Sequence, residues 1–309
     1  SDVCSSDLSS ADYRSDVAIS PGILKQMTEA YRKIRNTCRY LLSNLYDYDP
    51  TKECVAYEQM PEIDQWALLK LHQLIKKVTE AYENYEFHTV HHNIHNFCAV
   101  DMSAIYLDII KDRLYTSKAD SLERKSAQTV MYDIIDALVR MLTPILAFTS
   151  EEIWQYLPHQ EKESTVQVAA WPVYEERYLN AALEKKWDKI LAVRDFVAKP
   201  LEEARQRKDI GHSLDARVQL YANKEWYAFL SNLQNDLAAI FITSGVSLLQ
   251  AEQVPEGAYT SEDEALAGLA VVVGKASGEK CERCWIYSES VGQDAEYPTL
   301  CHRCATVLK

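Results

Sequence analysis

Two pairs of cysteines near the carboxyl end constrain the fold of this chain more than any other feature. Each pair has the spacing C-x-x-C, which can bind a metal ion from a tight turn, and four thiolates complete the tetrahedral shell that Zn²⁺ prefers. Because four sulfur ligands leave no open coordination position, the pattern predicts one structural Zn²⁺ and not a catalytic metal. The alternative is two chance pairs or two disulfides. The four predicted ligands are Cys281, Cys284, Cys301 and Cys304.

Length and composition indicate a globular protein of two or three domains. The chain has 309 residues, of which 47% are hydrophobic and 26% are charged. We expect no membrane partner, because no apolar run approaches the roughly 20 residues that cross a bilayer. The other four cysteines are scattered without paired spacing, which favours a reducing compartment and therefore the cytoplasm. The net charge of −13 argues against general nucleic-acid binding.

A local basic stripe is nevertheless present on the helix expected over residues 25–45. At 100° per residue, Arg32, Arg35 and Arg39 cluster along one side of that helix, beside an apolar stripe that includes Ile34 and Cys38. A stripe of this kind is usually a solvated helix face, and the alternative is a surface that follows nucleic-acid phosphates.

The first half of the chain predicts an antiparallel helical bundle over residues 11–175. The polar residues 1–10 are expected to be a leader outside the fold. Ser20 is the expected cap of the first bundle helix, and Thr149 with Glu152 has the spacing of a capping box for the last one. The helices between them are predicted over 61–84, 87–115 and 122–142.

The second half predicts a small α/β unit over residues 176–275, followed by a zinc-binding module over 276–309. A charged helix over 183–208 is expected to end at Gly211. Alternating and β-branched patterns predict strands, and a further helix lies between the first two. The predicted elements are strands over 216–221, 240–249 and 269–273 and a helix over 225–238. The fold class is therefore mainly α, with a bundle, a small α/β unit and a four-cysteine zinc finger.

No catalytic centre is visible in the sequence, and we predict no catalytic residue. The eight glycines are dispersed and form no phosphate-binding loop. His88 with His92, or His91 with His95, could share a metal from one helix face, but no carboxylate or cysteine ligand accompanies them. Solvated or core-edge histidines are the better interpretation.

Several longer strings resemble a known family. Residues 34–45, 97–115 and 141–154 resemble the anticodon-binding helices of class I aminoacyl-tRNA synthetases of the isoleucine, valine and leucine group. Residues 210–216, 278–285 and 301–304 are similar to the carboxy-terminal extension of bacterial-type isoleucyl-tRNA synthetases. The resemblance covers essentially the whole chain after residue 10.

The resemblance implies a tRNA-recognising fragment of such an enzyme, with the tRNA for isoleucine as its partner. ATP and Mg²⁺ would act only in the catalytic domain, whose HIGH and KMSKS motifs do not occur here. Arg32, Arg35 and Arg39 are then candidates for contacts with the RNA backbone. Arg283 and Arg303, on the two metal-binding turns, are candidates for contacts near the anticodon loop. Trp285 is expected to pack in the module core, and the fragment is expected to be a monomer.

Two other classes of protein compete with this interpretation. A similar four-cysteine finger ends some DNA glycosylases, but their amino-terminal nucleophile and β-rich core are not visible here, so we expect no DNA partner. The other class is a purely structural helical scaffold with a metal clip, which would bind neither RNA nor DNA.

Overall fold

The computed structural model describes residues 2–14, 16, 19–158, 163–251 and 253–309. It confirms a mainly helical fold with a small sheet and a four-cysteine cluster near the carboxyl end. The chain divides into two compact units, which are described separately. The first unit is Ser1–Ile110 with Ala119–Glu184, and the second is Lys111–Lys118 with Lys185–Lys309. None of the described helices has the length and apolar character needed to cross a membrane.

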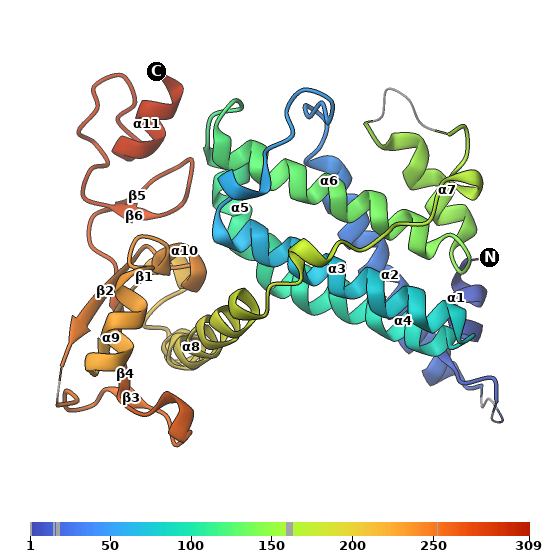
Figure 1. Ribbon diagram of the computed structural model, residues 1–309. Helices are drawn as coiled ribbons and strands as arrows, with labels where there is room; N and C mark the ends of the chain where they lie inside the picture. The colour runs from blue at the N-terminus through green and yellow to red at the C-terminus, as the bar shows by residue number, and fades with distance from the viewer. Residues whose placement is uncertain (1, 15, 17–18, 159–162, 252) are drawn as a thin grey trace. The chain divides into compact units, whose positions relative to one another are not determined.

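The first unit consists of packed helices (Figure 1). Its longest helices are α2, α3 and α6, and α3 contacts both α4 and α6. The continuous run α4, η2 and α5 ends in the second unit. The helices are α1 (Asp2–Ser10), α2 (Pro21–Ser43), α3 (Glu62–Glu83), α4 (Phe87–Asn96), η2 (Phe97–Tyr106), α5 (Leu107–Thr116), α6 (Leu122–Leu142) and α7 (Ala147–Tyr156), with single turns η1 (Tyr57–Gln59), η3 (Val166–Val168) and η4 (Glu176–Tyr178).

The start of α2 and its apolar face follow from the sequence as expected. Ser20 caps the helix by accepting a hydrogen bond from the Ile23 N–H at 3.2 Å, and Pro21 occupies the first turn, where no N–H is needed. Ile34, Cys38 and Leu41 are buried on one side of α2. Trp66 of α3 is fully buried too, so both aromatic and aliphatic side chains contribute to the buried interior of this unit.

A buried carboxylate links three helical segments of the first unit. Asp64 of α3 accepts hydrogen bonds from the Tyr106 hydroxyl at 2.7 Å and from the Ser126 hydroxyl at 2.5 Å. Asp64 has no exposed surface. A buried charge is stable only when it is hydrogen-bonded, so this network fixes the register of α3, η2 and α6.

The structure corrects two expectations about helices in the first unit. The helix predicted over 87–115 is continuous, but its middle, Phe97–Tyr106, is π-helical; there the Ser103 hydroxyl donates to the Cys98 carbonyl at 2.7 Å. The capping box predicted at Thr149 is wrong. Helix α7 already begins at Ala147 without a side-chain cap, and the Thr149 hydroxyl hydrogen-bonds to the Tyr31 hydroxyl at 2.9 Å.

The segment expected to be a leader outside the fold also differs from the prediction. Within residues 1–10, Asp2–Ser10 form the helix α1, which contacts α2 and α4. The physical reason lies at the start of α7, where the Asp2 carboxylate accepts hydrogen bonds from the N–H groups of Phe148 and Thr149. These N–H groups have no partner within their own helix, so a carboxylate is favourable there.

The second unit contains a four-stranded sheet in the order β2-β1-β4-β3. β1 runs parallel to β2 and antiparallel to β4, so Val218 lies opposite Val246 on one side and Val273 on the other. Helix α9 contacts both β1 and β2. The elements are α8 (Ala181–Gln206, from Lys185 in this unit), η5 (Ser213–Asp215), β1 (Ala216–Ala222), α9 (Lys224–Ser231), α10 (Leu237–Phe241), β2 (Gly245–Gln250), β3 (Tyr259–Thr260), η6 (Glu264–Leu266), β4 (Leu269–Lys275), β5 (Glu279–Lys280), β6 (Tyr287–Ser288) and α11 (His302–Leu308).

Two boundaries in the second unit differ from the sequence prediction. The strand expected over 240–249 begins only at Gly245, because Ile242 has left-handed backbone angles (φ 55°) and closes α10 through hydrogen bonds to its last carbonyls. Helix α8 ends in the same way at Lys208 (φ 62°), before Gly211 is reached. In both places a side-chain-bearing residue adopts the conformation that sequence patterns assign to glycine.

Candidate metal centre

The first C-x-x-C pair lies in a tight hairpin between β5 and β6. The Cys281 N–H donates to the Ile286 carbonyl at 3.0 Å, and the Trp285 N–H donates to the Cys281 carbonyl at 2.8 Å. Gly278 enters this hairpin with φ 84°, and a Cβ there would lie 2.3 Å from the Ser288 carbonyl carbon. Only glycine fits this position, so Gly278 belongs to the framework of the site.

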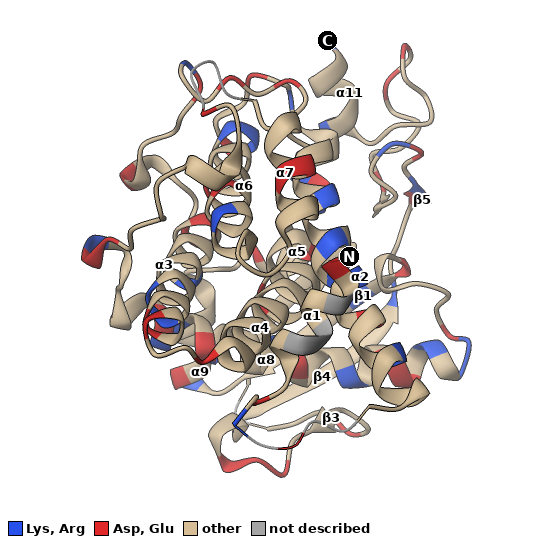
Figure 2. Cartoon of the chain, turned by 90° about the vertical axis from the view of Figure 1, so that its right-hand side faces the viewer, with Lys and Arg blue, Asp and Glu red and all other residues tan. Residues whose placement is uncertain are grey.

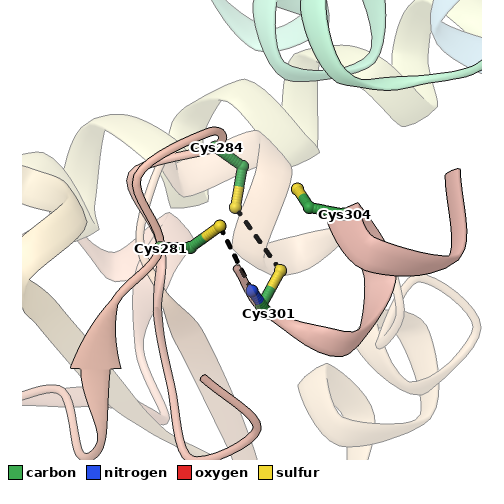
Figure 3. A group of neighbouring side chains, drawn as sticks. All are labelled: Cys281, Cys284, Cys301 and Cys304. Carbon is green, nitrogen blue, oxygen red and sulfur yellow. Dashed lines mark hydrogen bonds between the residues drawn. The ribbon is translucent and has the colours of Figure 1, made fainter. Parts of the chain in front are cut away.

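The second pair lies at the start of α11. Cys301 is the residue before the first turn of this helix, and Cys304 lies within that turn. The Cys301 N–H donates to the Cys281 sulfur at 3.3 Å, which joins the second pair to the first. Figure 3 shows the four side chains with their sulfur atoms directed toward one another.

The cluster fits a tetrahedral metal ion. Its four ligand sulfurs all lie within 4.8 Å of one another, and all four cysteines are buried. The sulfurs of Cys284 and Cys301 are 3.7 Å apart. Zn–S bonds of about 2.3 Å at tetrahedral angles place sulfurs about 3.8 Å apart. Among the described residues, this is the one group of three or more His, Cys, Asp or Glu placed to share a metal, so the histidine pairs of α4 form no such group.

The electrostatics of the cluster favour a cation among the sulfurs. Burial acts to raise the pKa of Cys281, but backbone N–H groups of Cys284, Cys301 and Arg283 outweigh it and lower that pKa to about 6. Burial raises the pKa of Cys284 and of Cys304. Thiolates this close repel one another, so several ionise together only when a metal ion compensates their charge.

Arg283 and Arg303, predicted near an anticodon loop, both contact the end of α5 within the second unit. The Arg283 guanidinium donates to the Thr116 carbonyl at 2.6 Å. Arg303 forms a bidentate ion pair with Asp112, with Nη1–Oδ2 and Nη2–Oδ1 distances of 2.5 and 2.8 Å. Sequence reasoning missed Asp112 and Thr116, because no local pattern connects α5 to cysteines that follow more than a hundred residues later.

Trp285 differs from its predicted place in the module core. The side chain is 59% exposed, and the Lys280 ammonium lies 5.2 Å from its ring centroid. Its backbone has φ 66°, the conformation that lets the chain leave the first C-x-x-C turn. The exposed indole is therefore available for stacking with a planar group.

The basic stripe of the first unit lies on the exposed side of α2. Figure 2 shows lysine and arginine residues on this helix. Arg32, Arg35 and Arg39 are all exposed, while Ile34 and Cys38 beside them are buried. Arg32 pairs with Glu29 at 2.8 Å on the same helix. The side chains of Arg35 and Arg39 form no hydrogen bond or ion pair with the part of the chain that the structure describes.

Two family models match this combination of helical unit and metal cluster. Residues 64–220 match the anticodon-binding domain of tRNA ligase. Residues 278–307 match the zinc finger found in FPG and IleRS. The first match spans half of the chain, so the chain belongs to the family of tRNA ligases that carry this anticodon-binding domain.

Within that family, the chain is similar to isoleucine–tRNA ligases, which confirms the resemblance drawn from the sequence. It is 57% identical over 304 residues to that of Moorella thermoacetica, covering 98% of this chain and 32% of the relative. The ligase of Carboxydothermus hydrogenoformans is 59% identical over 301 residues, covering 97% of this chain and 32% of the relative. The chain thus spans about a third of the length of the curated relatives it matches.

Among solved structures, the chain is similar to a ternary complex of Agrobacterium radiobacter K84 agnB2 LeuRS with tRNA and LeuAMS. The TM-score is 0.41 at 13% sequence identity, over 81% of this chain and 28% of that one. A likeness this distant adds nothing to the assignment.

Proposed function

We propose that this chain is the tRNA-recognising, carboxy-terminal part of an isoleucine–tRNA ligase, which attaches isoleucine to its tRNA with ATP. The observation that carries the proposal is the 57% identity over 98% of the chain to a relative of that name. ATP and Mg²⁺ then belong to a catalytic domain whose motifs are absent from these 309 residues. The protein is proposed to be a monomer.

We propose further that Cys281, Cys284, Cys301 and Cys304 bind one structural Zn²⁺. The sulfur spacing, the burial of all four cysteines and the zinc-finger family match support this ligand set. The zinc ion would hold the two C-x-x-C turns together and would leave no position for a substrate.

The proposed RNA contacts lie in both units. Arg32, Arg35 and Arg39 are positioned on an exposed helix face and would contact phosphates, which supply affinity without reading sequence. The exposed Trp285 would stack on an unpaired anticodon base. Arg283 and Arg303 remain part of the proposed interface near the loop, although their guanidinium groups also hold residues 112–116.

A cytoplasmic location is also part of the proposal. Cys38, Cys54 and Cys98 are free thiols in the structure, which suits a reducing compartment. The side chain of Cys4 lies outside what the structure describes.

The test is a titration of the 309-residue chain with the tRNAs for isoleucine and valine at two salt concentrations. Substituting Arg32, Arg35 and Arg39 by Ala should weaken both tRNAs about equally and flatten the salt dependence, because fewer counterions are released. Trp285→Ala should weaken binding of the isoleucine tRNA by about 1–3 kcal/mol. Arg205→Ala, an exposed arginine paired with Glu202 on α8, is the matched control.

Two further measurements separate this proposal from its competitors. Duplex DNA added as a competitor should not displace the tRNA, whereas a DNA-repair protein would prefer the duplex. The purified chain should catalyse no isoleucine-dependent pyrophosphate exchange above the no-protein background. Equal affinity for both tRNAs with no salt dependence would reject the proposed interface.

A further inference from the structure

Both C-x-x-C pairs carry an arginine directly before the second cysteine, and both arginines reach the same short stretch of α5. Arg283 belongs to the first pair and donates to the Thr116 carbonyl at 2.6 Å. Arg303 belongs to the second pair and forms the bidentate ion pair with Asp112. Asp112 and Thr116 are four residues apart, and the Thr116 hydroxyl donates to the Asp112 carbonyl at 2.8 Å. One helical turn thus receives two guanidinium groups.

This helix end is chemically suited to bind cations. The last four carbonyls of an α-helix have no N–H partner within the helix, and Thr116 is the last residue of α5. The helix dipole adds partial negative charge at the same end. A carboxylate one turn earlier, Asp112, matches the two parallel N–H groups of a guanidinium.

We infer that Arg283, Arg303 and the centre formed by the four cysteines make a metal-dependent clasp on residues 112–116. In this clasp both arginines are positioning residues: they fix the metal module so that the exposed Trp285 is presented in one orientation. This role of Trp285 rests on the proposed function. Asp112 and Thr116 are the residues that receive the clasp.

The dependence on metal follows from where the arginines are attached. Arg283 lies on the β5–β6 hairpin, and Arg303 lies on the first turn of α11. A metal shared by both C-x-x-C pairs fixes these turns to each other, in addition to the hydrogen bond from the Cys301 N–H to the Cys281 sulfur and the packing of Ile286 against the cysteines. When the metal leaves, the two guanidinium groups lose their common geometry, and the end of α5 loses both partners at once.

The test is hydrogen–deuterium exchange of the amides of residues 112–118 in the whole 309-residue chain. Removal of the metal with a chelator should speed this exchange about three- to tenfold, although the cysteines follow these residues by more than 160 positions. Asp112→Asn, which weakens only the pairing with Arg303, should give part of this acceleration while the chain still binds one zinc ion. Asp120→Asn, an exposed acid just after this stretch, is the matched control and should change nothing.

A charge exchange tests the pairing itself. Asp112→Arg combined with Arg303→Asp places a cation close to the carboxyl end of α5 and an acid in the first turn of α11, which both helix dipoles favour. The double variant should restore slow exchange that each single variant loses, and zinc content measured alongside shows that the centre is intact. Unchanged exchange after chelation and after Asp112→Asn would overturn the clasp.

Measuring the affinity of the same variants for tRNA tests the clasp and the proposed function separately. If Asp112→Asn speeds exchange and also lowers the preference for isoleucine tRNA over valine tRNA, the clasp and the proposed function are both supported. If exchange speeds while the unsubstituted chain already lacks that preference, the proposed function fails and the clasp stands as a structural device. If exchange speeds while the tRNA preference is unchanged, the arginines are not positioning residues for Trp285.

Discussion

The Cys301 N–H donates to the Cys281 sulfur at 3.3 Å, so the second C-x-x-C turn is hydrogen-bonded to a sulfur of the first. A hydrogen bond of this kind stabilises a thiolate, and backbone donors of the same type hold the pKa of Cys281 at about 6. The surroundings of Cys281 therefore favour its thiolate, which is the form that binds a metal ion.

Replacing Cys284 by Ser should release the proposed zinc ion and unfold residues after about Gly274. In zinc-finger peptides, metal binding contributes roughly 10–16 kcal/mol, most of which appears as folding free energy. Metal analysis should find one zinc per unsubstituted chain and none in the variant, while the circular dichroism of the helices is nearly unchanged. Zinc that stays bound after the substitution would refute this ligand set.

Gly278→Ala should weaken metal binding although Gly278 is not a ligand. The residue has φ 84°, and an added Cβ would lie 2.3 and 2.4 Å from the backbone of Ser288 and Glu289, so β5 and β6 must separate. The check is a competition for zinc against a chromogenic chelator. Gly274→Ala is the control, because nothing lies within 4 Å of its Cβ position. Equal zinc affinity of the two variants would contradict the prediction.

Asp64→Ala should lower the free energy of unfolding of the chain by about 3 kcal/mol, because the Tyr106 and Ser126 hydroxyls lose a buried acceptor. Urea unfolding followed by helix ellipticity measures this change. Tyr106→Phe, which removes one of the donors, should cost less than Asp64→Ala. Asp120→Ala at an exposed position should be nearly neutral. A loss no larger than that of Asp120→Ala would show that the network is not stabilising.

Because of the lowered pKa of His72, the free energy of unfolding of the helical unit should decrease as the pH falls. Burial lowers the pKa of His72 from 6.5 to about 4, and its Nδ1 accepts a hydrogen bond from the Glu175 N–H at 3.0 Å, which a protonated ring atom could not do. Between pH 6.5 and 4 the unfolded chain therefore binds a proton that the folded chain does not, so stability present above pH 6.5 is lost on acidification.

The measurement for His72 is the urea midpoint of the unsubstituted chain and of His72→Gln across this pH range. Glutamine retains an acceptor for the Glu175 N–H but does not titrate, so the variant should lose less stability between neutral pH and pH 4. The comparison is needed because burial raises the pKa of Asp133 to about 7, which shifts stability in the opposite direction in both proteins. Parallel curves for the two proteins would contradict the assignment to His72.

Local sequence patterns determined the cysteine cluster and several features of the helices. The C-x-x-C spacing predicted which cysteines come together, and the apolar period of residues 31–45 predicted which side of α2 is buried. Ser20 and Pro21 predicted the start of α2. These features depend on residues close in sequence, where bond geometry and helix periodicity limit the possible arrangements.

Only the tertiary structure decided which surface residues are already engaged. Arg35 and Arg303 are both exposed arginines, yet Arg35 forms no ion pair with the described part of the chain and Arg303 holds Asp112, which lies 191 positions away. Trp285 is exposed, although we predicted from the sequence that it packs in the module core. The physical reason is that partners distant in sequence compete for a charged or aromatic side chain, and periodicity carries no information about which partner folding brings near.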